Sequence, residues 1–168
     1  MFRQRFDPVS STFTYLLACD RTREAVLIDA LLEQRERDLG LLAELGLRPR
    51  WLLDTHVHAD HVTAVSALKA ALADGPAITI AVGLACEAEG YEKALSHGER
   101  LTFGDEHLDV IATPGHTPGS MSFLWRDKLF TGDALLIGGC GRTDFQGGDA
   151  GQLYDAVTQR LFTLPGET

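Results

Sequence analysis

The chain of 168 residues lacks any apolar run of the roughly 18 residues that a membrane-spanning helix needs. Its first six residues include two arginines and a glutamine and lack the continuous apolar segment of a secretory signal. Repeats, low-complexity segments and linker-like stretches are also absent from the sequence. From these absences we expect one domain over residues 1–168 and no association with a membrane.

Cysteine is scarce, and its three positions, Cys19, Cys86 and Cys140, have no regular spacing. Small secreted domains that depend on disulfides carry an even number of closely spaced cysteines. The sequence therefore favours a reducing compartment, and we expect a cytoplasmic protein.

Positive charge is also in short supply. Lysine and arginine total 15 against 24 aspartates and glutamates, which gives a formal net charge of −9. An acidic surface repels phosphate backbones, so we expect no nucleic-acid partner. The apolar fraction of 45% is too high for a disordered chain and is typical of a globular domain.

The apolar pattern predicts strands and helices that alternate irregularly. Strands are expected at residues 12–18, 25–28, 51–53, 78–82, 108–112, 121–125 and 129–130, and helices at 39–45, 65–72 and 153–161. Residues 86–97 are ambiguous, with a helix as the favoured interpretation. Several hairpins argue against a purely parallel sheet, so the pattern predicts an α+β fold of two mixed sheets with helices packed outside.

The strongest chemical feature follows the strand expected at residues 51–53. Residues 55–61 read Thr-His-Val-His-Ala-Asp-His, so three imidazoles and one carboxylate fall within six positions. Burying such a cluster is costly because each imidazole needs a polar partner. A metal ion satisfies this need, since imidazole binds zinc, iron, copper and nickel and a carboxylate adds an anionic ligand. The alternative is a solvated loop that is rich in histidine.

Two further candidate ligands lie downstream. His116 is the centre of a Pro-Gly-His-Thr-Pro-Gly turn, whose prolines and glycines hold the ring in one direction, as a ligand requires. Asp133 follows Gly132 directly after an expected strand and can point into a site at a sheet edge. Alone, His116 is more typical of a loop histidine and Asp133 of a turn. Their occurrence together, in this order, favours a metal site.

The pattern T-H-x-H-x-D-H, then G-H-T-P-G, then G-D resembles the metallo-β-lactamase superfamily. The resemblance implies an αββα sandwich with the metal site at the edge of the two sheets. It also implies a later histidine within a Pro-x-His-Asp-Tyr-like stretch, which this sequence lacks. We therefore expect a truncated fold without the final strand and helix, in which a second metal site is incomplete.

A narrower resemblance involves residues 6–17, 132–137 and 141–146, which are similar to the persulfide dioxygenase branch. This resemblance implies one Fe(II) per chain, held by His56, His116 and Asp133. It implies the oxidation of glutathione persulfide by O2 and water to sulfite and glutathione, in sulfide detoxification, and it suggests a homodimer. Two histidines and one carboxylate also form the facial triad of non-haem Fe(II) oxygenases, which leaves open positions on the metal.

The other residues of the first motif have two possible roles. In a dioxygenase His58, Asp60 and His61 orient the iron ligands and water without binding the iron. If they bind metal themselves, two zinc ions and hydrolysis are favoured.

Arg142 is our candidate for the substrate contact. Its guanidinium can bind a carboxylate of glutathione in bidentate fashion. An ion pair with Asp144 or Asp149 is an equal alternative. Asp29 is interpreted as a structural residue.

Two other functions compete with the dioxygenase. One is a zinc thioester hydrolase similar to glyoxalase II, and the other is a metal-binding domain without turnover. Residues 141–146 favour the dioxygenase over the hydrolase.

Overall fold

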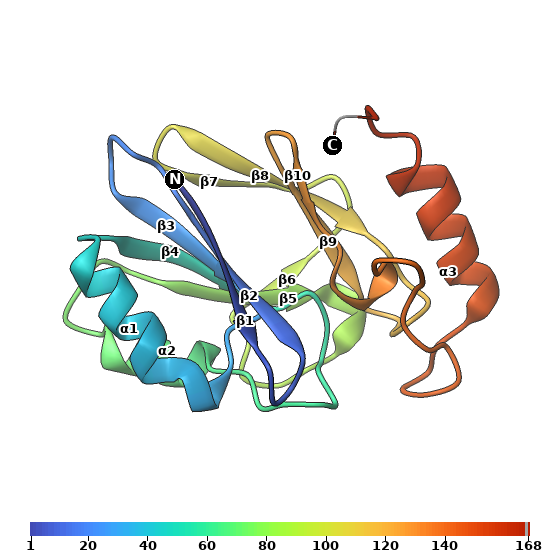
Figure 1. The fold of residues 1–168 in the computed structure, drawn as a ribbon, viewed down its shortest axis with the longest axis horizontal. Helices are drawn as coiled ribbons and strands as arrows, with labels where there is room; N and C mark the ends of the chain where they lie inside the picture. Colours follow the sequence, from blue (N-terminus) through green and yellow to red (C-terminus); the bar gives the residue numbers. More distant parts are fainter. Residues whose placement is uncertain (167) are drawn as a thin grey trace.

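Two β-sheets lie face to face in the computed structural model, which describes residues 1–166 and 168 (Figure 1). Helices α1 and α2 lie on the outer side of the first sheet, and α3 lies beside the second (Figure 1). The expected α+β sandwich of two sheets flanked by helices is therefore confirmed.

The first sheet has six strands, which follow one another in chain order. They are β1 (Phe2–Asp7), β2 (Thr12–Ala18), β3 (Glu24–Ile28), β4 (Arg48–Leu53), β5 (Thr79–Gly83) and β6 (Lys93–Leu95). Strands β1 to β3 pair in antiparallel fashion and β3 to β6 in parallel, so this sheet is mixed. Because β3 and β4 are parallel neighbours, the residues that follow them emerge at the same edge.

The second sheet has four strands in the order β10-β9-β8-β7, and all its pairings are antiparallel. The strands are β7 (Arg100–Phe103), β8 (Glu106–Ala112), β9 (Met121–Trp125) and β10 (Lys128–Phe130). A tight turn joins β9 to β10, and Arg126 adopts a left-handed backbone there, with φ of 56°.

Three helices and several short turns complete the structure. They are α1 (Arg35–Glu44), α2 (Val65–Ala71), α3 (Ala150–Ala156), the 3-10 turns η1 (Leu32–Gln34), η2 (Leu84–Cys86) and η3 (Gly132–Ala134), and the π-helical turn η4 (Val157–Leu161). The carboxylate of Asp149 accepts a hydrogen bond from the backbone N–H of Gln152 at 2.8 Å and thereby caps α3. No helix within residues 1–166 and 168 is long and apolar enough to cross a bilayer.

The apolar core has three parts, and the largest lies between the sheets. Side chains of both sheets meet there, among them Leu17, Val26, Ile28, Leu53, Phe103, Leu108, Val110 and Phe123, each fully buried. Burial of one such side chain contributes roughly 1.5–3 kcal/mol before the entropic cost of folding. This layer fixes the two sheets against each other and so fixes the loops at their edge.

Three segments differ from the sequence-based expectation. Strands β1 and β7 were not predicted, because exposed polar residues interrupt their apolar pattern. The helical interpretation of residues 86–97 is wrong, since η2 ends at Cys86 and β6 pairs in parallel with β5. A strand of three residues is too short to show a period of its own.

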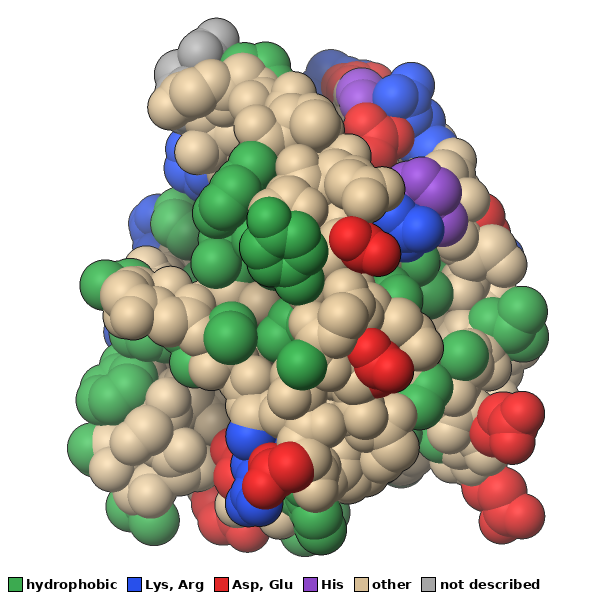
Figure 2. All heavy atoms as spheres, turned by 90° about the vertical axis from the view of Figure 1, so that its right-hand side faces the viewer, with side chains coloured by type: hydrophobic (Ala, Val, Ile, Leu, Met, Phe, Trp, Pro, Cys, Tyr) green, Lys and Arg blue, Asp and Glu red, His purple; other side chains and the backbone are tan. Residues whose placement is uncertain are grey.

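Acidic and basic side chains are interspersed on the face beside α3 (Figure 2). Exposed apolar side chains lie among them, and Tyr154 of α3 and Phe162 after η4 are exposed. The described part of this face has no continuous basic surface. The expectation of no nucleic-acid partner stays a prediction.

Candidate metal centre

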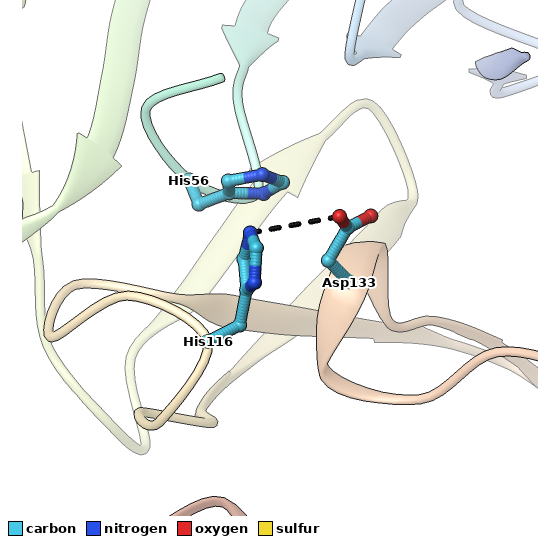
Figure 3. Close-up of side chains that lie close together, drawn as sticks. All are labelled: His56, His116 and Asp133. Atoms are coloured by element: carbon cyan, nitrogen blue, oxygen red, sulfur yellow. Dashed lines mark ion pairs between the residues drawn. The ribbon is translucent and has the colours of Figure 1, made fainter. Parts of the chain in front are cut away.

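His56, His116 and Asp133 converge at one edge of the sandwich (Figure 3). One ligand atom from each residue lies within 4.8 Å of the others. Nε2 of His116 is 3.5 Å from Oδ2 of Asp133. His56 follows β4 of the first sheet, whereas His116 and Asp133 follow β8 and β10 of the second. The structure thus brings the predicted triad together, and its role as a ligand set stays a prediction.

Hydrogen bonds fix the direction of both imidazole rings. Nδ1 of His116 lies 2.8 Å from the backbone carbonyl oxygen of Arg142, which can only accept, so Nδ1 carries the proton. Nδ1 of His56 lies 2.9 Å from the hydroxyl of Thr55. Both rings therefore keep Nε2 free, as metal-binding histidines do when their other nitrogen is hydrogen-bonded.

The electrostatic environment keeps His56 neutral. Burial and then the neighbouring His58 lower the pKa of His56 to about 3. The two ring centroids are 4.1 Å apart. A histidine must be unprotonated to bind a metal, so His56 is ready for ligation at neutral pH. The two nitrogens and one carboxylate fit an ion such as Fe(II).

Asp29 is a buried carboxylate directly after β3, and it forms hydrogen bonds with Thr55 of the first motif. Its oxygens accept hydrogen bonds from the backbone N–H of Thr55 at 2.7 Å and from the Thr55 hydroxyl at 3.0 Å. Thr55 in turn contacts Nδ1 of His56. The structural interpretation of Asp29 is therefore incomplete, since this residue orients a candidate ligand through Thr55.

Asp29 also forms a charged pair with His58, whose Nε2 lies 3.1 Å from Oδ1. Burial disfavours the charged imidazole, but the charge of Asp29 and the hydrogen bond outweigh it and raise the pKa of His58 to about 9. Burial likewise disfavours the carboxylate, and the charge of His58 brings the pKa of Asp29 below its ordinary value. His58 is thus held by a buried carboxylate that also contacts Thr55.

Asp54 is a second buried carboxylate, which the sequence analysis did not single out. It accepts hydrogen bonds from the Tyr91 hydroxyl at 2.5 Å and the Thr63 hydroxyl at 3.0 Å. Burial and the nearby charge of Asp29 raise the pKa of Asp54 to about 6. Its place directly after an apolar strand was the available signal, and the same signal identified Asp133.

His58, Asp60 and His61 form another group whose ligand atoms lie within 4.8 Å of one another. Oδ2 of Asp60 lies 3.1 Å from Nδ1 of His61, and Oδ1 lies 3.8 Å from Nδ1 of His58. Nε2 of His61 is buried without a hydrogen-bond partner among the described residues. The structure therefore brings the three residues together beside the triad. Whether they orient the iron ligands or bind a metal themselves stays a prediction.

The loop that carries His116 is locked by close backbone contacts. A Cβ atom on Gly141 would lie 2.5 Å from the carbonyl oxygen of Asp133 and 2.8 Å from Nδ1 of His116. A Cβ on Gly83 would lie 2.0 Å from the carbonyl oxygen of Gly119. Only glycine permits these approaches, so the candidate ligands depend on two positions without side chains, Gly83 and Gly141.

The Arg142 side chain forms an ion pair with Asp144, with Nε 2.7 Å from Oδ1, and lies over the ring of Phe145. Asp149 instead caps α3. The ion pair with Asp144, which was the alternative to a substrate contact, is thus present in the structure. A contact with substrate stays a prediction.

A cavity of about 500 Å³ opens beside Asp133. Its wall combines hydroxyl, apolar and acidic side chains, among them Ser10, Ser11, Thr12, Phe13, Tyr15, Asp60, Leu136 and Ile137. This size suits a small organic molecule.

Comparisons with known proteins show the family of the chain. A sequence profile of the Metallo-beta-lactamase superfamily matches residues 7–166. The chain is 47% identical to the mitochondrial persulfide dioxygenase ETHE1 of Homo sapiens over 99% of its own length. A crystal structure of ETHE1 from Myxococcus xanthus superimposes with a TM-score of 0.94 at 50% identity, covering all of this chain and 72% of the other.

A hydrolase-like protein is less similar to this chain. The hydroxyacylglutathione hydrolase-like protein of Mus musculus is 38% identical over 95% of this chain, which covers 56% of that protein. The chain spans 65% of the length of the human dioxygenase.

Proposed function

Since the chain belongs to the metallo-beta-lactamase superfamily, we propose that it is a persulfide dioxygenase with one Fe(II) per chain. The reaction takes glutathione persulfide, O2 and water to sulfite and glutathione. The observation that carries this proposal is the convergence of two imidazole nitrogens and one carboxylate within 4.8 Å. Such a triad leaves positions open on a bound metal.

Fe(II), when bound by His56, His116 and Asp133, supplies the redox chemistry that lets O2 react with a persulfide. The chain's own part is to hold the ligands. Thr55 and the carbonyl of Arg142 keep the Nε2 atoms free. Fixed ligands reduce the reorganisation that metal binding requires.

The cavity beside Asp133 is our proposed binding place for the glutathione portion of the substrate. Arg142 is the proposed contact for a carboxylate of glutathione. Its side chain is 63% exposed, so it can exchange Asp144 for a substrate carboxylate without unfolding the loop. A guanidinium prefers such bidentate partners.

The zinc hydrolase remains the second candidate function. The observation that favours it is the ligand-like spacing of His58, Asp60 and His61 beside the triad. A third candidate, a metal-binding domain without turnover, is compatible with the chain's 65% coverage of its relative. A homodimer and a cytoplasmic location stay predictions, and the human relative is a mitochondrial protein.

One experiment separates these functions. Protein made in iron-rich cells is analysed for metal content, and its O2 uptake is measured with glutathione persulfide while sulfite is quantified. We expect about one iron per chain and sulfite formation that matches O2 uptake. Two zinc ions per chain with thioester hydrolysis would establish the hydrolase, and one iron without O2 uptake would establish the inactive domain.

A further inference from the structure

Thr12, the first residue of β2, reaches across to the group formed by His58, Asp60 and His61. Its hydroxyl oxygen lies 3.2 Å from Oδ2 of Asp60 and 3.4 Å from Nδ1 of His61. A weaker contact of 3.5 Å joins it to the carbonyl oxygen of Ser10. Thr12 is therefore the residue through which the β1–β2 turn contacts this group.

The turn that carries Thr12 is itself held in place. The buried carboxylate of Asp7 accepts hydrogen bonds from the backbone N–H and the hydroxyl of Ser10, both at 2.8 Å. The side-chain amide of Gln34 donates to the other oxygen of Asp7 at 2.8 Å. The Thr12 hydroxyl thus approaches Asp60 from a fixed direction.

Asp60 has the freedom to turn if nothing holds it, because its side chain is 51% exposed. In the structure Oδ2 is engaged by Thr12 and by Nδ1 of His61. A carboxylate must direct an oxygen lone pair at a metal ion to bind it. The two contacts on Oδ2 therefore compete with metal binding through this oxygen and fix the direction of the other.

We propose that Thr12 limits the number of metal ions in this protein, by holding Asp60 against His61 and so disfavouring a second divalent ion at His58, Asp60 and His61. This inference rests on the proposed one-iron function. Two histidines and a carboxylate suit zinc, so the group can hold a second ion, which displaces the proton of His58, once Asp60 is released. Thr12 acts through Asp60 and is a positioning residue.

The expected effect follows from the strength of the contact. A hydrogen bond to a charged group is equivalent to roughly a 10- to 150-fold change in an equilibrium constant. Thr12→Val removes the hydroxyl and keeps the shape of the side chain. The variant is therefore expected to bind a second zinc ion at least about 10-fold more tightly than the unaltered chain.

The test is a calorimetric zinc titration of metal-free protein, which gives the number of ions and each affinity without any activity assay. We expect one tight site in the unaltered chain and two in Thr12→Val. Thr12→Ser retains the hydroxyl and should match the unaltered chain. Thr102→Val, the same change at an exposed position of β7, is the control for the substitution itself. Adding Asp60→Asn to Thr12→Val should remove the second site.

If Thr12→Val binds the second ion as weakly as the unaltered chain, the inference is wrong and the proposed one-iron function is unaffected. If the unaltered chain takes up two ions tightly and is isolated with two, both proposals fail. Circular dichroism first establishes that each variant is folded. If Thr12→Val is not folded, Thr12→Ala replaces it, because it also lacks the hydroxyl. Weak binding of the second zinc ion by Thr12→Ala would then contradict the inference.

Discussion

The backbone carbonyl oxygen of Arg142 accepts a hydrogen bond from Nδ1 of His116 at 2.8 Å, while the side chain of Arg142 pairs with Asp144. The two parts of Arg142 thus have separate tasks. The carbonyl orients a candidate ligand and survives any side-chain substitution. The guanidinium can therefore be removed without disturbing the triad.

Arg142→Ala is expected to keep its iron and its fold but to raise KM for glutathione persulfide. Loss of a charged hydrogen-bonded contact costs about 1.5–3 kcal/mol, or roughly 10- to 150-fold. Steady-state O2 uptake against substrate concentration measures it. The pair with Asp144 is exposed and screened by solvent, so Asp144→Ala, the control, should leave Tm nearly unchanged. An unchanged KM with a sharp fall in Tm would make Arg142 a purely structural residue.

Gly141→Ala is expected to weaken metal binding and to destabilise the chain. The new Cβ would lie 2.5 Å from the carbonyl oxygen of Asp133 and 2.8 Å from Nδ1 of His116, so both must shift. Overpacking of this kind costs roughly 1–3 kcal/mol, and each kcal/mol lowers Tm by about 2–4 °C at this chain length. Gly139→Ala is the matched control, because its Cβ would meet nothing within 4 Å. Equal Tm and iron content in both variants would contradict the prediction.

His116→Ala should abolish iron binding and turnover, because only two candidate ligands remain. His61→Ala should retain iron and lose roughly 10- to 100-fold in affinity or activity, as expected for a residue that supports the ligands. Iron content and O2 uptake of the two purified variants provide the measurement. Complete and equal loss of metal in both would show that His61 binds the ion directly.

Thr55→Val should lower metal affinity by roughly 10- to 100-fold. The hydroxyl of Thr55 contacts Nδ1 of His56 and donates to Asp29, so its loss frees the ring and leaves a buried carboxylate with one partner fewer. Competition against a chelator of known affinity measures the change. Thr55→Ser keeps the hydroxyl and should restore most of the affinity. If Thr55→Ser binds metal as weakly as Thr55→Val, loss of the hydroxyl alone does not account for the fall in affinity.

Removal of the metal by a chelator should lower Tm. A ligand at 100 times its Kd stabilises the folded state by about 2.7 kcal/mol, which corresponds to roughly 5–11 °C here. Differential scanning calorimetry with and without added Fe(II) under anaerobic conditions detects this shift. His116→Ala should show no response to the metal, and a response equal to that of the unaltered chain would place the ion elsewhere.

The sequence predicted the triad because each candidate ligand lies in a short motif that follows an apolar strand. The supporting residues could not be found in this way. Asp29 meets Thr55 because β3 and β4 pair in parallel, and Thr12 meets Asp60 because the β1–β2 turn folds over the same edge. Such contacts depend on the arrangement of strands, which local patterns do not encode.

The overall fold was predicted more fully than the positions of its individual strands. Strands with continuous apolar runs, such as β3 and β4, were recognised because both of their faces are largely covered. Strand β6 was not, since it has three residues and depends on pairing with β5. Where tertiary pairing and not local pattern sets the conformation, a periodicity argument has nothing to detect.

The meeting of Gly83 with the carbonyl oxygen of Gly119 joins the two sheets backbone to backbone, with no room for even a methyl group. Any larger residue at Gly83 would act as a wedge and tilt the turn that carries His116. In a library of all single substitutions selected for retained metal, Gly83 should consequently tolerate no replacement. Exposed Gly139, 20 positions after Gly119 in the chain, should accept many.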